Sequence, residues 1–189
     1  MKKAKNPREE KKKSGESSPY RWALTVFCMA VALSAALSLA SESVLSGAGV
    51  AVALLILALF IILGIVFDVI GVAVTAADPR PFHSMAAHKE KGAKAAIRLL
   101  QNANQVSSVC NDVVGDICGI VSGSTAAVIV THLQRDLSTT SVLISIGATA
   151  LISGITIGGK ALGKTVAINQ CTSVVYRVAR IMHALHLSR

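Results

Sequence analysis

VAVALLILALFIILGIVFDVIGVAV, Val50–Val74, is the stretch that decides the fold of this chain. It holds a single charged residue, Asp68, and it is longer than the run of about 20 apolar residues that a helix needs to cross the hydrocarbon of a membrane. The 189-residue chain is 52% hydrophobic and 15% charged, whereas soluble domains are about 25% charged. We therefore predict an all-α integral membrane protein.

Four apolar segments are long enough to span a membrane, at residues 22–40, 47–77, 106–133 and 137–159. We predict a transmembrane helix for each of them. The first segment has a second interpretation, because a basic stretch precedes it and Ser38-Leu39-Ala40 carries the small residues of a signal-peptide cleavage site. Cleavage would leave three transmembrane helices, and retention leaves four.

Composition divides the chain into three parts. Residues 1–21 form a Lys-rich tail that cannot bury a core, so we predict a disordered cytoplasmic segment. Residues 22–45 hold the extra N-terminal span or signal sequence, and residues 46–189 form the remaining transmembrane domain. Within that domain we predict a juxtamembrane belt of amphipathic helices over residues 79–104 and a C-terminal amphipathic helix over residues 166–187.

The juxtamembrane belt contains its own start and break signals. Pro79 and Pro81 are expected to end the second span, because proline cannot continue a helix. Apolar and basic residues then recur with a helical period, which places the segment among the lipid headgroups. Gly92 is expected to divide it into two short helices.

The basic residues predict an orientation. With four spans, all Lys and Arg residues except Arg135 fall on one side of the membrane. The positive-inside rule then puts both termini in the cytoplasm, and we expect a multi-pass protein of the plasma membrane. The net charge of +9 fits attraction to an anionic inner leaflet. We expect no nucleic-acid partner, because the charges flank apolar runs and few aromatic residues are available for stacking on bases.

GGKALGKT, Gly158–Thr165, matches the phosphate-loop pattern G-x-x-x-x-G-K-[ST]. That motif requires a short buried strand before it, whereas the preceding apolar run has the length of a membrane span. We judge the match a false positive and expect no nucleotide. Lys160 and Lys164 are instead expected to extend to the headgroups at the cytoplasmic end of the last span.

Four polar residues of the spans are candidate metal ligands: Asp68, Asn111, Asp112 and Asp116. Asp112 and Asp116 are four residues apart and therefore share one helix face. Carboxylate and amide oxygens suit Mg²⁺, as a bound or transported ion. The alternatives are that Asp68 lies near the cytoplasmic interface and that the other three are solvated at a helix start or bridge to basic groups such as Arg98.

A row of glycines in the third span has a separate implication. Gly115, Gly119 and Gly123 follow one another at four-residue spacing, which allows helices to approach closely in membranes. We expect this face to pack inside the helix bundle or to form the interface of a homodimer.

The order of elements, together with KGAKAAIRLLQNANQVSSVCNDVVGD at Lys91–Asp116, resembles the transmembrane domain of the cyclin M (CNNM) and CorB/CorC magnesium transport family. The resemblance covers residues 47–187. Gly92, Ala95, Leu99 and Leu100 approximate the end of the family's belt, and residues 110–115 approximate its G-N-T-x-x-N motif. It implies an all-helical, dimeric membrane protein that transports magnesium.

The chain departs from that family at its ion-binding motifs. The family's Ser-x-Ser-Glu-Thr is replaced by FDVIGVAVTAAD, which leaves Asp68 and Thr75 as substitutes, and the Glu of its G-E-x-x-P-K falls at Lys160 or Ala161. No regulatory CBS pair or CorC domain is expected. We predict divalent cation (magnesium) transport, with a non-transporting scaffold or regulator as the alternative. No catalytic constellation is recognisable, so we do not expect an enzyme.

Overall fold

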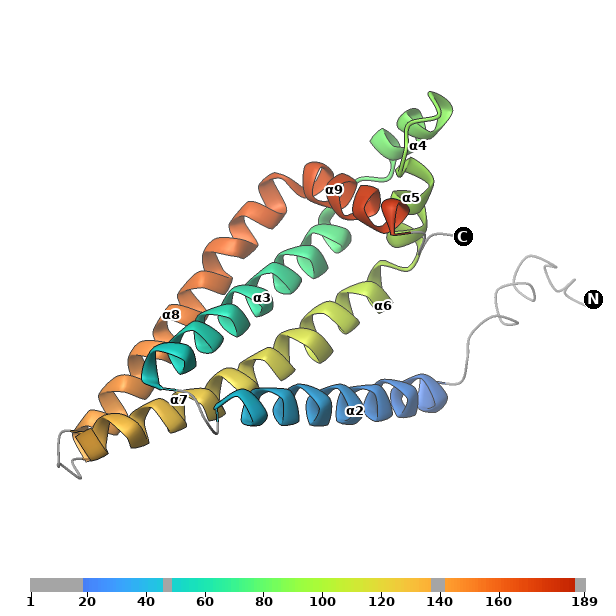
Figure 1. Cartoon of the computed structure of the whole chain (residues 1–189). Helices are drawn as coiled ribbons and strands as arrows, with labels where there is room; N and C mark the ends of the chain where they lie inside the picture. The colour runs from blue at the N-terminus through green and yellow to red at the C-terminus, as the bar shows by residue number, and fades with distance from the viewer. Residues whose placement is uncertain (1–18, 46–48, 137–141, 186–189) are drawn as a thin grey trace, which may run out of the picture.

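The computed structural model describes residues 19–45, 49–136 and 142–185, and the regular structure within them is helical (Figure 1). The helices run in chain order as α2 (Pro19–Leu45), α3 (Val50–Ala76), α4 (Arg80–Ala87), α5 (Ala93–Gln101), α6 (Ala103–Ser108), the π-helix η1 (Val109–Gly115), α7 (Asp116–Asp136), α8 (Val142–Asn169) and α9 (Cys171–Ala184).

Four stretches of helix are long and apolar enough to cross a membrane, which confirms the predicted number of spans. They are Trp22–Ser43, Val50–Ala76, Ala103–Arg135 and Ser145–Asn169. The third of these joins α6, η1 and α7 into one continuous rod. Residues 1–18, 46–48, 137–141 and 186–189 lie outside the described part of the chain, and with them most of the predicted N-terminal tail.

Two helix boundaries differ from the sequence-based expectation. The fourth span was expected to end near Gly159, but α8 remains helical to Asn169. The C-terminal amphipathic helix therefore begins at Cys171 and not at residue 166. The physical reason is that glycine is tolerated inside a helix that packs closely on a neighbour, so the glycines near position 159 do not interrupt α8.

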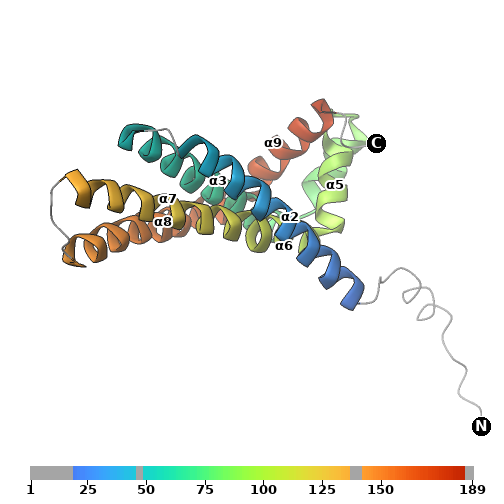
Figure 2. The ribbon, with the colours of Figure 1, turned by 60° about the horizontal axis from the view of Figure 1, so that its bottom comes forward.

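Helix α3 is the centre of the bundle. It packs against α6, η1, α7, α8 and α9, because it is apolar around its whole circumference and has no polar face to turn outward. Helix α2 lies across α7 and η1 (Figure 2). Its residues Val26, Ala30 and Leu33 contact a cluster around Ile117 and Val121.

The belt, α9 and the C-terminal part of α3 share a core at one end of the bundle (Figure 1). Phe82 of α4, Ala96 of α5, and Val175 and Ala179 of α9 are all buried there. The predicted break in the belt is confirmed, since α4 and α5 are separated at Gly92, whose φ of 91° is in the left-handed region. Helix α3 ends at Ala76, just before the two prolines, as the sequence predicts.

Replacing Gly92 by alanine tests how firmly the belt is fixed. A Cβ at this position would stand 3.1 Å from the Cα of Arg180 in α9, and the positive φ disfavours any L side chain. We expect Gly92→Ala to lower the free energy of unfolding by about 1–3 kcal/mol, measured by thermal or denaturant unfolding in detergent. Gly147→Ala is the control, because nothing lies within 4 Å of a Cβ there. Equal stability of the two variants would contradict the described contact.

Candidate functional site

Two rows of close contacts define the faces of α3. A Cβ on Gly64 would lie 3.2 Å from the Cβ of Cys118, and a Cβ on Gly71 would overlap the side-chain amide of Asn111. Gly64 and Gly71 therefore face the third span. On another side, Ile65 and Val69 contact α8, where a Cβ added to Gly163 would lie 2.8 Å from Val69 Cγ2.

Asp68 lies at the border between these two faces. It follows Gly64 by four residues and precedes Gly71 by three, so it is on the side of α3 that faces the third span. Its neighbours Ile65 and Val69 face α8. We call the line along which α3, η1 and α8 meet the seam, and the partly buried Asp68 is the acidic residue of α3 at the seam.

Asn111 approaches the same part of α3 from η1. Its Nδ2 donates a hydrogen bond to Ser107 Oγ at 3.3 Å. Among the described residues, its Oδ1 is the buried side-chain polar atom that has no hydrogen-bond partner. An unpaired buried acceptor costs about 1–3 kcal/mol. Single-turn π-helices such as η1 are frequent at functional sites, because the wider turn re-aims side chains.

The other two predicted ligands do not join Asp68 and Asn111. Asp112 and Asp116 are exposed, while Val113 and Ile117 form the buried side of the same rod. In the part of the chain that the structure describes, no group of three or more His, Cys, Asp or Glu side chains is placed to hold a metal ion. The structure thus brings two of the four predicted residues toward the seam and leaves two on the surface.

Lys160 is a seam residue that the sequence analysis assigned to the headgroups. It is half-buried, and its Nζ lies 3.9 Å from the position of a Cβ on Gly115 of η1. The prediction that Lys160 extends to the headgroups is therefore wrong, because α8 turns this residue toward η1. Lys164 is exposed.

The sequence matches one family model, the cyclin M transmembrane N-terminal domain (CNNM), over residues 54–187. The chain belongs to the CNNM family. No significant match to it was found among curated proteins or among solved structures. The match confirms the resemblance found in the sequence and extends from α3 to α9, so that α2 lies outside it.

The glycine row of this CNNM protein is not a packing face within the chain. Gly115 is buried, but nothing lies within 4 Å of a Cβ on Gly119 or Gly123, and both are exposed. Positions four apart advance by about 40° around an α-helix, so the row winds away from α3. The expected bundle packing is wrong for these two positions, whereas a homodimer interface there stays a prediction.

The residues of the CNNM protein that match the phosphate-loop pattern form part of a continuous helix. Residues 158–165 lie wholly within α8 and are helical. A phosphate loop requires a strand followed by an irregular loop whose N–H groups point at the ligand, whereas in α8 these groups donate to helical carbonyls. Gly159 and Gly163 instead allow α8 to approach Ile65 and Val69 of α3.

A double variant tests the contact between Gly71 and Asn111. Gly71→Ala places a methyl group against the Asn111 amide, so we expect it to destabilise the protein by about 1–3 kcal/mol. Asn111→Ala removes the obstruction, so the double variant should recover most of that loss, because the two residues touch and their effects couple. Unfolding in detergent measures all three variants, and additive losses would argue against the contact.

Proposed function

We propose that this CNNM-family protein moves a divalent cation, preferentially Mg²⁺, across the membrane along the seam. The observation that carries the proposal is the unpartnered, buried Oδ1 of Asn111 beside the face of α3 that holds Asp68. A buried acceptor without a donor is suited to a cation. The family match supports a membrane protein of this class.

The two seam residues would have different roles. Asp68 would supply the negative charge that offsets the cost of taking the ion out of water, and Asn111 would supply a neutral oxygen. Mg²⁺ commonly keeps several waters and takes one or two carboxylates, so this small set of oxygens matches its chemistry. Asp112 and Asp116, exposed on the third span, would attract the cation from the outer surface of the rod.

A second candidate function is a non-transporting scaffold or regulator. It is favoured by Lys160, whose ammonium group is directed at η1 and places a fixed positive charge near the proposed ion position. Like charges repel strongly at low dielectric, so Lys160 would oppose entry of a divalent cation. In this case the fold would be kept for contacts with partner proteins.

We also propose a homodimer in the plasma membrane with both termini in the cytoplasm. The exposed positions Gly119 and Gly123 offer a close-packing face to a second copy. The belt with its basic residues lies at one end of the bundle, and Arg135 lies in the last turn of α7 at the other (Figure 1). This distribution supports the predicted orientation.

The experiment is Mg²⁺ flux into proteoliposomes, together with Mg²⁺-dependent thermal stabilisation of the purified protein. We expect Asp68→Asn and Asn111→Ala each to weaken the response about tenfold, which corresponds to about 1.4 kcal/mol of ion binding. Glu42→Gln is the matched control, since that carboxylate is exposed in α2 and has no role in the proposed ion path. Size-exclusion chromatography confirms that each variant is folded.

Lys160→Gln separates the two candidate functions. For a transporter, the wild type should respond to Mg²⁺, and Lys160→Gln should respond at a lower Mg²⁺ concentration, because the repelling ammonium charge is removed. For a non-transporting protein, the wild type should not respond to Mg²⁺ at all, and a response should emerge in Lys160→Gln. A wild-type protein that neither transports nor is stabilised by Mg²⁺ contradicts the first proposal.

A further inference from the structure

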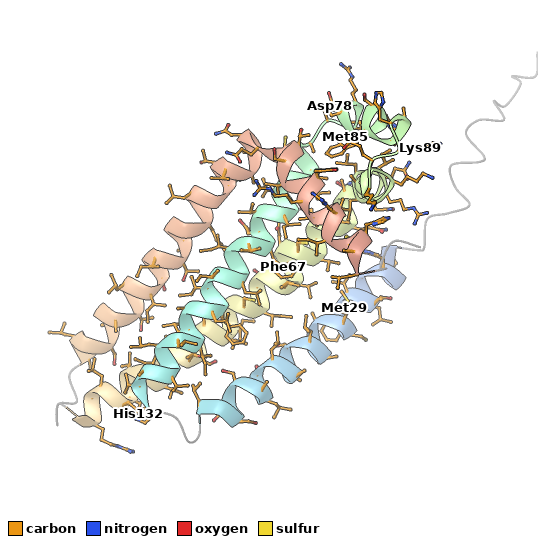
Figure 3. All side chains as sticks on the ribbon, turned by 45° about the horizontal axis from the view of Figure 1, so that its top comes forward. Met29, Phe67, Asp78, Met85, Lys89 and His132 are labelled. Carbon is orange, nitrogen blue, oxygen red and sulfur yellow. The ribbon has the colours of Figure 1, made fainter. Side chains whose placement is uncertain are left out.

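A cavity of about 430 Å³ lies at the belt end of the molecule, between the α4–α5 turn, α5 and the C-terminal part of α9. We call it the basic cavity, because its lining includes Lys89, Lys91, Lys94, Arg98 and His183. Figure 3 shows Lys89 at this end of the bundle. The cavity is separate from the seam and from the proposed ion path.

The described residues do not balance the charges of the basic cavity. Its one acidic residue is Glu90, whose Oε2 accepts a hydrogen bond from the Tyr176 hydroxyl at 3.2 Å. In residues 19–45, 49–136 and 142–185, the one side-chain ion pair joins Arg80 to Asp78, outside the cavity. Lysines and an arginine around a hollow can bind an anion, and an arginine can donate two parallel hydrogen bonds to one phosphate.

Lys89 has a backbone conformation that is unusual for a residue with a side chain. Helix α4 ends in a Schellman motif, in which Glu90 N–H donates to Met85 O at 3.0 Å and Lys89 N–H donates to Ala86 O at 3.1 Å. Lys89 occupies the left-handed position of this motif, with φ 58°, where glycine is the ordinary residue. It is the non-glycine residue with positive φ in the described chain. Strained positions of this kind cluster at functional sites.

The turn that carries these charges is fixed against α9. Gly92, the second left-handed residue of the turn, is buried against the backbone of Arg180. The Glu90–Tyr176 hydrogen bond makes a second connection between the turn and α9. The basic cavity is therefore a preformed hollow, and a ligand that enters it does not have to order the turn.

A second hollow, an apolar groove of about 620 Å³, is lined by residues of α3, α5, α6, η1 and α9. Phe67 and Ile70 of α3, Val106 of α6 and Val178 of α9 contribute to its lining. Figure 3 shows Phe67 midway along the bundle, and this residue belongs to the span Val50–Ala76. The groove is thus at a depth where acyl chains are present.

Sequence neighbours line the two hollows. On α5, Arg98 lines the basic cavity and Leu99 lines the groove. On α9, His183 lines the basic cavity and Met182 lines the groove. The two hollows consequently flank the same contact between α5 and α9, one basic and one apolar.

We propose that the basic cavity and the groove together bind one anionic phospholipid, with its phosphate in the cavity and an acyl chain in the groove. Charge complementarity selects the phosphate, and the groove selects a ligand that carries a long apolar chain. Basic pockets between transmembrane helices near the cytoplasmic surface bind anionic headgroups by the same chemistry. This site goes beyond the proposed ion transport and does not depend on it.

Lipid retention by the purified full-length chain tests the site. Mixed micelles that contain equal amounts of phosphatidylglycerol and phosphatidylcholine serve as the probe, and native mass spectrometry counts the lipids that stay bound. We expect one phosphatidylglycerol to be retained about tenfold in preference to phosphatidylcholine. Arg98→Gln should abolish the preference, whereas the control Arg135→Gln, at the other end of the bundle, should preserve it.

Several outcomes would overturn the proposal. Equal retention of the two lipids would exclude selection by charge, and an equal effect of Arg135→Gln would indicate general attraction to anionic lipid. Displacement of phosphatidylglycerol by free glycerol phosphate at a similar concentration would indicate a site for soluble phosphates. Val178→Trp fills the groove, so undiminished lipid retention in that variant would exclude a bound acyl chain.

Lys89→Gly distinguishes a binding role of Lys89 from a structural one. Glycine is the favoured residue at this φ, so we expect an unchanged or higher melting temperature. The preference for phosphatidylglycerol should nevertheless fall by about threefold or more, because one of the phosphate-binding charges is lost. A lower melting temperature with undiminished lipid preference would contradict the role assigned to Lys89.

Discussion

Close approach of small residues to α3 is the constraint on which the rest of the structure depends. Gly64 and Gly71 of α3 leave room for the third span to pack closely. Gly159 and Gly163 of α8 leave room for the side chains of Ile65 and Val69. In a bilayer there is little hydrophobic gain from helix association, so tight packing must supply the stability. These same contacts fix the rotation of each helix about its axis. They thereby place Asn111 against Gly71 and Lys160 beside Gly115, and they leave Asp112 exposed.

Most of the fold could be predicted from the sequence, because hydropathy and helix-breaking residues report length directly. The four spans, the end of α3 before Pro79 and the break at Gly92 all follow from such signals. Helix rotation could not be predicted in the same way. Helix α3 is apolar on every side, so its pattern does not indicate which side meets which neighbour.

Only part of the candidate site could be predicted, because the sequence does not show how each helix is rotated about its axis. Asp112 and Asp116 stood out by their spacing, yet spacing alone does not say whether a shared face is buried. A signal for the seam was available in the positions of Gly64, Asp68 and Gly71, which repeat at helical intervals and would have placed the acid on a packing face. No residue pattern signals the π-helix that directs Asn111 toward Gly71, or the left-handed conformation of Lys89.

The core at the belt end has a mechanical consequence for the whole molecule. Residues from α3, α4, α5, α8 and α9 are buried together there, so the belt-end parts of α3 and α8 are joined through one cluster. At the opposite end, α7 and α8 are connected through residues 137–141, and the cluster that the buried residues form is smaller. Helices α3 and α8 thus share a fulcrum, a common fixed point of rotation, at the belt. A given rotation about that fulcrum displaces their far ends most, and the seam, which lies between the two, opens or narrows by an intermediate amount.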